Sequence, residues 1–329
     1  MTAPALSLRH LKVDFVTRRG TLHAIDDLSI DIARGEILGV VGESGAGKTV
    51  TGLAVIGLIE PPGRISGGEI HLAGQRIDNL APEAMRAVRG RRIGMIFQDP
   101  LTSLDPLYRV GDQLVETIRT HTTLSTAAAR RRAIELLAEV GIPAPERRID
   151  GYPHEFSGGM RQRVVIALAL CAEPELIIAD EPTTALDVSV QAQIIAMLKR
   201  LAREHGTAVM LVTHDMGVIA EIADSVAVMY AGRLVENGPV RDVVQRPLHP
   251  YTRGLMGAIP TLEGSGARLV QIPGAMPRLS AIPAGCAFHP RCPAALERCR
   301  HDRPEPRSTA QQTVACHLYD DHPAKDPVA

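Results

Sequence analysis

Residues 42–49 read Gly42-Glu43-Ser44-Gly45-Ala46-Gly47-Lys48-Thr49, a glycine-rich stretch between an apolar run and a helical pattern. The apolar run, Glu36–Val41, is typical of a strand buried on both faces of a sheet. The helical pattern covers Lys48–Leu58, and Pro61-Pro62-Gly63 stops it. In such a strand–loop–helix, backbone N–H groups can turn inward around phosphates, Lys48 can reach the terminal phosphates, and Thr49 can offer its hydroxyl to Mg²⁺. We call residues 42–49 the phosphate loop.

The rest of the first 240 residues alternates strand and helix patterns. Leu6–Ile32 alternates apolar and polar residues, as antiparallel strands do. Buried-strand runs follow at residues 67–72, 93–97, 176–179, 209–212 and 225–229, and helical spacing occurs at 110–120, 127–140, 190–204 and 217–223. The alternation predicts an α/β fold with a mostly parallel sheet covered by helices.

Polar side chains follow three of these strands. Asp180 and Glu181 end one apolar run, where a carboxylate can hold Mg²⁺ and its neighbour can activate a water molecule as general base. Gln98 ends a second run and could sense Mg²⁺ or water. His214 ends a third, and we expect it beside Lys48 and Asp180 at the carboxyl edge of the sheet, contacting a γ-phosphate.

A second anion site is predicted at Phe156-Ser157-Gly158-Gly159-Met160-Arg161-Gln162-Arg163. Ser157, Gly158 and Gly159 lie just before the apolar helical pattern Val164–Cys171, so they offer a hydroxyl and bare N–H groups at a helix N-terminus. One nucleotide cannot occupy both anion sites unless the chain folds back or meets another chain. The stretch therefore predicts an assembly.

Composition excludes several classes of protein. The 329 residues are 45% hydrophobic and 22% charged, as in soluble proteins with a sizeable core. A net charge of -1, 3% aromatic residues and no Trp argue against nucleic-acid binding. No apolar run approaches the roughly 20 residues that span a bilayer, and the N-terminus lacks a signal-peptide pattern. We therefore expect a cytoplasmic chain that can still dock on a membrane protein.

Four cysteines lie in a Pro-rich tail after Gly238: Cys286, Cys292, Cys299 and Cys316. Their spacing is not that of a zinc ribbon, but four thiolates could bind a [4Fe–4S] cluster or Zn²⁺ and so supply folding energy. Four free, partly buried thiols are the other interpretation. His289, His301 and His317 are alternative ligands that we expect at the surface, and Cys171 is expected to be a buried core thiol.

The order of these motifs, with Ala185-Leu186-Asp187 between Glu181 and His214, resembles the ATP-binding cassette (ABC) ATPases over about residues 5–240. The resemblance implies a P-loop NTPase fold, with a RecA-like parallel sheet, an antiparallel β-subdomain and an α-helical insertion at about residues 99–157. It implies ATP contacts from Gly42, Ser44, Gly45, Ala46, Gly47, Lys48, Thr49, Val50, Gln98 and Asp180, and Mg²⁺ held by Thr49, Gln98 and Asp180. Glu181, His214, Gln98 and Lys48 would be catalytic.

The same resemblance implies a head-to-tail dimer of cassettes. Ser157, Gly158 and Gly159 of one cassette would close over the ATP of its partner. The family also stacks an aromatic residue on adenine, and here Phe15 and Arg19 are both candidates. An arginine plane can replace the aromatic ring.

The segment Arg246–Leu255 and the four tail cysteines narrow the resemblance to ATPase subunits of oligopeptide, dipeptide and nickel importers. This implies a nucleotide-binding domain at residues 1–240 and a Pro- and Cys-rich domain at 241–329. The partners would be a second, distinct cassette, two membrane permeases and an extracytoplasmic solute-binding protein, with this chain peripheral on the cytoplasmic face of the cell membrane. An iron–sulfur cluster is implied at the four cysteines, with Zn²⁺ as the alternative. Peptides are the expected solute; nickel or another small solute, or a soluble ABC ATPase with a redox- or iron-sensing tail, are alternatives.

Overall fold

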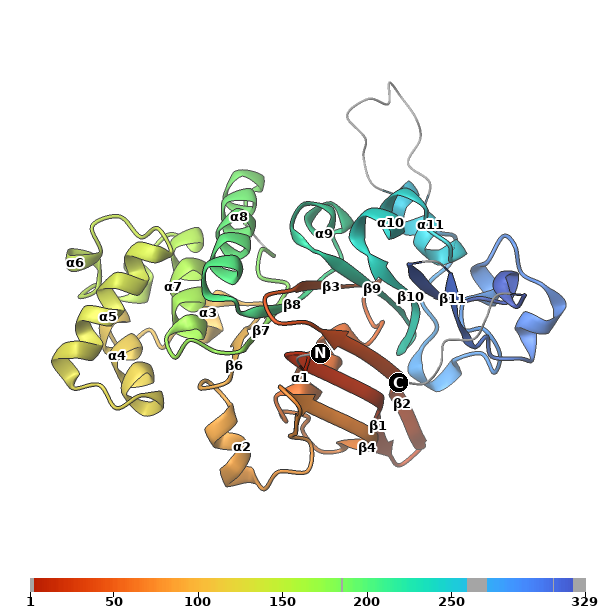
Figure 1. The fold of residues 1–329 in the computed structure, drawn as a ribbon, viewed down its shortest axis with the longest axis horizontal. Helices are drawn as coiled ribbons and strands as arrows, with labels where there is room; N and C mark the ends of the chain where they lie inside the picture. The colour runs from red at the N-terminus through yellow and green to blue at the C-terminus, as the bar shows by residue number, and fades with distance from the viewer. Residues whose placement is uncertain (1–2, 185, 259–270, 310, 322–329) are drawn as a thin grey trace. The chain divides into compact units, whose positions relative to one another are not determined.

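The computed structural model describes residues 3–184, 186–258, 271–309 and 311–321 (Figure 1). The chain divides into two compact units. The first unit comprises residues 1–6, 32–37 and 72–211, and the second unit comprises residues 7–31, 38–71 and 212–329.

Long N-terminal strands form one sheet of the second unit. β1 (Leu6–Thr17), β2 (Gly20–Ile32) and β4 (Gly63–Leu72) lie in the order β2-β1-β4. Leu11 and Val13 of β1 are buried, while Lys12 between them is exposed. The alternation predicted for residues 6–32 is therefore a real sheet with one buried face.

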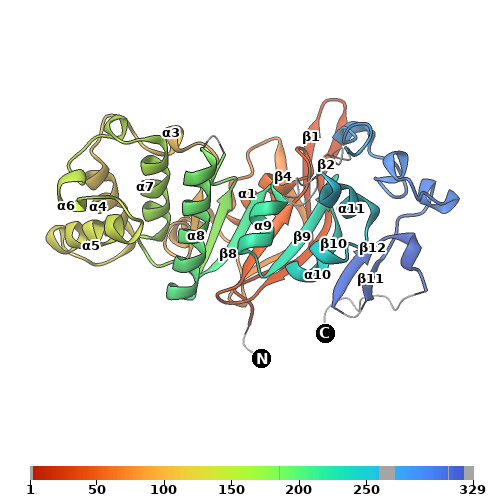
Figure 2. The same cartoon turned by 90° about the horizontal axis from the view of Figure 1, so that it is seen from above.

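A second sheet of this unit carries the phosphate loop. Its strands are β3 (Ile37–Val41), β9 (Ser225–Tyr230), β10 (Arg233–Pro239), β11 (Pro306–Thr309) and β12 (Gln312–Ala315), in the order β11-β12-β10-β9-β3. β3 and β9 are parallel, with Val40 opposite Ala227, and every residue of β3 is buried. β10 is antiparallel to both β9 and β12. Figure 2 shows β11 and β12 beside β10, so the C-terminal tail contributes two strands to this sheet.

Short helices complete the second unit. They are α1 (Lys48–Val55), α9 (Met216–Ile222), α10 (Val240–Gln245) and α11 (Pro250–Gly257), with single 3₁₀ turns at Leu279–Ala281, His289–Arg291, Glu297–Arg300 and His317–Tyr319. The helix predicted from Lys48 ends earlier than the Pro61-Pro62-Gly63 signal, because Gly57 adopts a left-handed φ of 63°.

The first unit contains β8 (Ala208–Thr213), β7 (Leu176–Asp180) and β6 (Ile93–Ile96), in that order. β6 and β7 are parallel, with Met95 opposite Ile178. Its other elements are β5 (Gln75–Arg76), α2 (Pro82–Val88), α3 (Pro100–Ser103), α4 (Val110–His121), α5 (Thr126–Glu139), α6 (Pro145–Arg148), a 3₁₀ turn (Pro153–Glu155), α7 (Gly158–Leu170) and α8 (Val188–His205). Helices α4 to α7 pack together (Figure 1).

The predicted parallel α/β architecture is thus present in both units. Each strand expected between residues 67 and 229 exists, and α4, α5, α8 and α9 begin and end within two residues of the predicted helical spacing. The helices and strands that were not predicted are β5, α2, α3, α6, β10, α10, α11, β11 and β12. Within the described part of the chain, no helix is both long and apolar enough to cross a membrane.

Candidate functional site

The phosphate loop joins β3 to α1 through three glycines with positive φ. Gly42, Gly45 and Gly47 have φ values of 156°, 84° and 103°, which side-chain-bearing residues rarely adopt. A Cβ atom at Gly42 would collide with the carbonyl oxygen of Met229, so the space as well as the dihedral requires glycine there. These glycines give the loop the tight path that turns its N–H groups inward.

Lys48 holds a positive charge against this loop. The residue is buried, and its ammonium group donates hydrogen bonds to the carbonyl oxygens of Gly42 at 2.8 Å and Glu43 at 3.1 Å. Gly47 caps α1 without any side-chain hydrogen bond, and the first turn carries no acidic residue. The helix N-terminus and the ammonium therefore favour an anion at the same loop.

The remaining loop residues lie around this charge. Ser44 and Thr49 are exposed, Val50 is half-buried, and Ala46 is fully buried. The N–H of Gly232 donates to the carbonyl oxygen of Ala46 at 2.9 Å and so fixes the middle of the loop.

In the first unit, the carboxylates end β7 beside the end of β6. Asp180 is the last residue of β7 and is buried. Glu181 has a left-handed φ of 47°. The Gln98 amide donates to Oε2 of Glu181 at 3.3 Å, and the Thr184 hydroxyl donates to the same oxygen at 2.9 Å. These two hydrogen bonds to one oxygen orient the Glu181 carboxylate.

Ser157 begins α7, as its sequence context predicts. It is the N-cap, and its hydroxyl oxygen accepts the Met160 N–H at 3.3 Å. Ser157 and Gly158 are exposed, whereas a Cβ atom at Gly159 would approach the Val190 side chain to 2.6 Å. An uncharged N-cap at an exposed helix start is suited to an approaching anion.

The segment after Glu181 leads into α8. Asp187 caps this helix, and its Oδ1 accepts the Val190 N–H at 2.9 Å and the Ser189 hydroxyl at 2.8 Å. These two hydrogen bonds, the backbone one first, lower the pKa of the Asp187 carboxyl. Of the motif Ala185-Leu186-Asp187, Ala185 lies outside the described residues. His214 of the second unit is exposed directly after the end of β8.

The four tail cysteines influence one another's charge. Burial raises the pKa values of Cys286, Cys292 and Cys316, that of Cys316 to about 11, and the charges of neighbouring cysteine thiols raise them further. Cys316 is affected by all three of the others, and the Cys286 N–H donates to the Cys299 carbonyl at 2.9 Å. Among the described residues, no group of three or more His, Cys, Asp or Glu side chains is arranged to hold a metal ion.

Two expectations about other potential ligands have different outcomes. Cys171 is buried, and burial raises its pKa to about 12, as expected of a core thiol. The surface location expected for His317 is wrong. Its side chain is only 3% exposed, because Nδ1 bonds the Asp320 carboxylate and Nε2 bonds the Asp302 carbonyl. His289 is half-buried and His301 is exposed.

Sequence reasoning missed three residues that contact the phosphate loop or flank it: Tyr230, Tyr251 and Arg291. No local pattern marks them. Around Arg291 the sequence is rich in Pro and Cys, which indicates a thiol site and not an arginine contact.

Two family models match parts of the chain. The chain matches the ABC transporter family over residues 25–184 and the oligopeptide/dipeptide transporter C-terminal region over residues 235–299. It is 48% identical over 311 residues to the oligopeptide transport ATP-binding protein OppD of Salmonella typhimurium, covering 94% of this chain and 92% of that protein. It is 47% identical over 319 residues to the dipeptide transport ATP-binding protein DppD of Bacillus subtilis, covering 96% and 95%.

Solved structures of ATP-binding cassettes are similar to this chain. A dimeric ATP-binding cassette in a post-hydrolysis state with ADP and Pi has a TM-score of 0.65 and 27% identity, covering 72% of this chain and 99% of that one. The protein cbiO1 of Clostridium perfringens, part of an ABC transporter complex, has a TM-score of 0.65 and 28% identity, covering 74% and 92%. The fold and the site together define a P-loop NTPase of the ATP-binding cassette type. This class of protein hydrolyses ATP, and the predicted fold class is confirmed. Given relatives of 48% identity along nearly the whole chain, it belongs to the ABC transporter family.

Proposed function

We propose that this chain is the ATP-hydrolysing subunit of a peptide importer. The observation that carries the proposal is the near full-length similarity to oligopeptide and dipeptide transport ATP-binding proteins, which includes the C-terminal region as well as the cassette. Residues 1–240 would form the nucleotide-binding domain, with its helical subdomain at about 99–157, and residues 241–329 the C-terminal domain.

Within the ATP site, each residue has a role that its chemistry supports. The N–H groups of Gly42, Ser44, Gly45, Ala46, Gly47 and Val50 would surround the phosphates, and the Lys48 ammonium would neutralise the β- and γ-phosphates. His214 would donate a hydrogen bond to the γ-phosphate. These positively polarised groups would stabilise the charge that develops on the transferred phosphoryl group.

Thr49, Asp180 and Gln98 would hold Mg²⁺, since a hydroxyl, a carboxylate and an amide oxygen are suitable ligands for a hard cation. The carboxylate of Asp180, buried at the carboxyl end of β7, offers an oxygen ligand of the kind this ion prefers. The ion would supply charge neutralisation at the β- and γ-phosphate oxygens.

Glu181 would be the general base. Its carboxylate would take a proton from a water molecule in line with the γ-phosphate, while Gln98 and Thr184 keep the carboxylate oriented. Ser157, Gly158 and Gly159 would contact the ATP held by a partner cassette, so that ATP joins two subunits and hydrolysis releases them.

The partners proposed are a second, distinct cassette ATPase, two membrane permeases and an extracytoplasmic solute-binding protein. This chain would sit peripherally on the cytoplasmic face of the cell membrane, and the helical subdomain after Gln98 would contact a permease. Gln98 bonds the proposed base and precedes α3, so movement of that subdomain can reach the catalytic carboxylate.

The four tail cysteines would hold a [4Fe–4S] cluster with a structural or regulatory role. The four thiols provide the donor set, and Cys286, Cys292 and Cys316, whose pKa values burial raises, would lose protons on binding. Zn²⁺ is the alternative occupant of the same four thiols.

Purification and reconstitution test the proposed function. A tagged chain isolated from detergent-solubilised membranes should carry with it two membrane proteins and a second cassette. In proteoliposomes with the solute-binding protein, a peptide mixture should stimulate ATP hydrolysis, and Lys48→Ala should abolish the stimulation. Stimulation by Ni²⁺ and not by peptides, or recovery without any membrane protein, would reject peptide import.

A further inference from the structure

Within the second unit, a buried arginine of the C-terminal region forms an ion pair with Glu43 of the phosphate loop. Arg291 donates from Nη1 to Oε2 of Glu43 at 2.6 Å and from Nη2 to Oε1 at 2.9 Å. The arginine side chain is 7% exposed and the glutamate side chain 29%. A bidentate pair with so little water around it has a defined geometry, unlike an exposed ion pair.

Contacts other than Glu43 also hold the guanidinium of Arg291 in place. Its Nε donates to the Pro273 carbonyl at 2.8 Å. Its carbon lies 5.9 Å from the ring centre of Tyr230 and 6.0 Å from that of Phe288, both within cation–π range. The hydrogen bond to Glu43, followed by smaller contributions, raises the pKa of Arg291, so the group is always charged.

Glu43 is held at its backbone as well. Its N–H donates to the Tyr251 hydroxyl at 2.8 Å, and its carbonyl accepts the Lys48 ammonium at 3.1 Å. The residue thus links Tyr251 and Arg291 of the C-terminal region to the lysine of the phosphate loop. Because the Lys48 ammonium bonds the carbonyl oxygens of both Gly42 and Glu43, the backbone path at Glu43 helps to position it.

Glu43 also poses an electrostatic problem. It places a carboxylate in a loop built to bind phosphates, and that carboxylate opposes an incoming triphosphate. Arg291 neutralises it at contact distance. We propose that Arg291 is a positioning residue for nucleotide binding. By neutralising and orienting Glu43, it makes the affinity of the phosphate loop for ATP depend on the folded C-terminal region.

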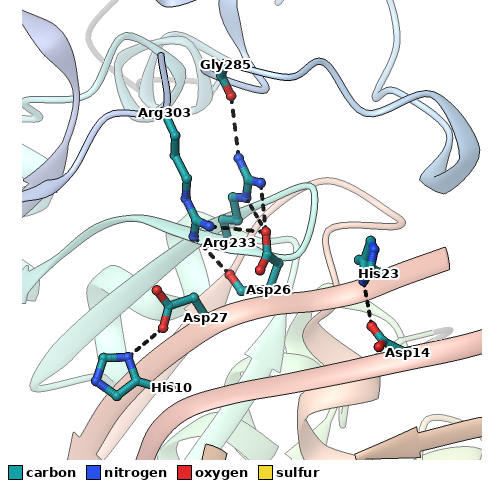
Figure 3. Close-up of polar contacts among 8 residues, drawn as sticks. All are labelled: His10, Asp14, His23, Asp26, Asp27, Arg233, Gly285 and Arg303. Atoms are coloured by element: carbon teal, nitrogen blue, oxygen red, sulfur yellow. Dashed lines mark hydrogen bonds and ion pairs between the residues drawn. The ribbon is translucent and has the colours of Figure 1, made fainter. Parts of the chain in front are cut away.

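A second contact of the same region supplies a matched control. Asp26 of β2 accepts hydrogen bonds from Arg233 at 2.7 Å and Arg303 at 3.2 Å, and Arg233 also reaches the Gly285 carbonyl (Figure 3). Burial raises the Asp26 pKa, but the two arginines outweigh burial and the pKa is lowered. Arg303 thus pairs with a carboxylate outside the phosphate loop, and Arg303→Met removes an arginine without exposing the charge of Glu43.

The proposal predicts different changes in Kd when Arg291 or Glu43 is replaced. The measurement is binding of a fluorescent ATP analogue to the purified full chain. Arg291→Met leaves Glu43 unneutralised, so the Kd should rise on the order of tenfold. Glu43→Gln leaves Arg291 uncompensated near the phosphates, so the Kd should stay the same or fall. The double variant should return towards wild type, and Arg303→Met should bind normally.

A purely structural role predicts a different pattern. Breaking the pair from either side would then weaken binding equally, and Glu43→Gln would not rescue Arg291→Met. Weaker binding in Glu43→Gln, or wild-type binding in a folded Arg291→Met, would overturn the proposal. If Arg291→Met does not fold, the Glu43→Gln result decides alone, because that change preserves side-chain volume. In steady-state hydrolysis the effects should appear in KM and not in kcat, since neither residue touches the reacting atoms.

Discussion

The side-chain amide of Gln98 donates a 3.3 Å hydrogen bond to the carboxylate of Glu181. The two residues are 83 positions apart in the sequence, and they meet because β6 and β7 are parallel neighbours whose carboxyl ends lie together. Glu181 combines this contact with a left-handed φ of 47°, a strained conformation of a kind that clusters at functional sites.

Gln98→Ala should slow hydrolysis of Mg-ATP by more than it weakens binding of ATP. The change removes a donor that orients the proposed base, and a loss of about 1.4 kcal/mol of orientation corresponds to roughly a tenfold lower kcat. Thr184→Val, which removes the donor at 2.9 Å, should have an effect of the same order. Steady-state kinetics measure kcat for each of the two variants. A wild-type kcat in both would contradict the orienting role of these donors.

Substitutions at Ser157 and at Lys48 should impair ATP hydrolysis in different ways. Lys48→Ala should prevent ATP binding by the isolated chain, because it removes the only ammonium in the phosphate loop. Ser157→Arg should leave that binding intact but block the partner's hydrolysis by filling the exposed helix start. In dimers with the partner cassette, Lys48→Ala should stop hydrolysis of the ATP held by this chain, and Ser157→Arg should stop hydrolysis of the ATP held by the partner. Loss of ATP binding by isolated Ser157→Arg would contradict this division.

His249 should make stability depend on pH. Burial lowers its pKa to about 3, and its Nδ1 accepts the Tyr251 N–H at 3.0 Å, so it is neutral in the folded chain. The unfolded histidine binds a proton below its ordinary pKa of 6.5. Stability from this group is therefore complete above pH 6.5 and falls as pH drops, by at most about 1.4 kcal/mol per pH unit.

The test is urea unfolding of wild type and His249→Asn between pH 7 and about pH 5. The neighbouring Glu236 has a pKa raised by burial and acts in the opposite direction, so the quantity to compare is the difference between the two proteins. That difference should shrink as pH falls. A constant difference would mean that His249 is protonated in the folded state or remains neutral in the unfolded one.

Cluster loading should rise with pH. Burial raises the thiol pKa values of Cys286, Cys292 and Cys316, so at neutral pH protons compete with iron for the sulfurs. Anaerobic reconstitution at several pH values, followed by the visible absorbance of bound iron–sulfur, measures this. Cys316→Ser should lower loading at every pH, whereas Cys171→Ser should not affect it. Equal loading across pH would indicate thiols that are already ionised.

Much of the cassette could be predicted because its signals are local. A continuous apolar run, a glycine pattern and a lysine specify β3, the phosphate loop and α1, and Ser157 was identified as a helix start from its neighbours alone. The strand-terminal positions of Asp180, Gln98 and His214 followed from the ends of apolar runs.

The C-terminal region could not be predicted to the same depth. The strands β11 and β12 have four residues each and are only partly apolar, so their pairing with β10 leaves no clear period in the sequence. Arg291 and Glu43 are 248 positions apart, and nothing near either one indicates the other. His317 is buried through partners at Asp302 and Asp320 that only the fold brings close.

The central claim is that this chain hydrolyses ATP through Glu181 in a two-cassette assembly. Single-turnover hydrolysis and gel filtration of Glu181→Gln with Mg-ATP test it most directly. Hydrolysis should fall by roughly 10²- to 10⁴-fold, since the base is lost, while ATP stays bound and the chain elutes as an ATP-containing dimer with itself or its partner cassette. Hydrolysis at the wild-type rate, or a variant that binds ATP but never associates, would contradict the claim.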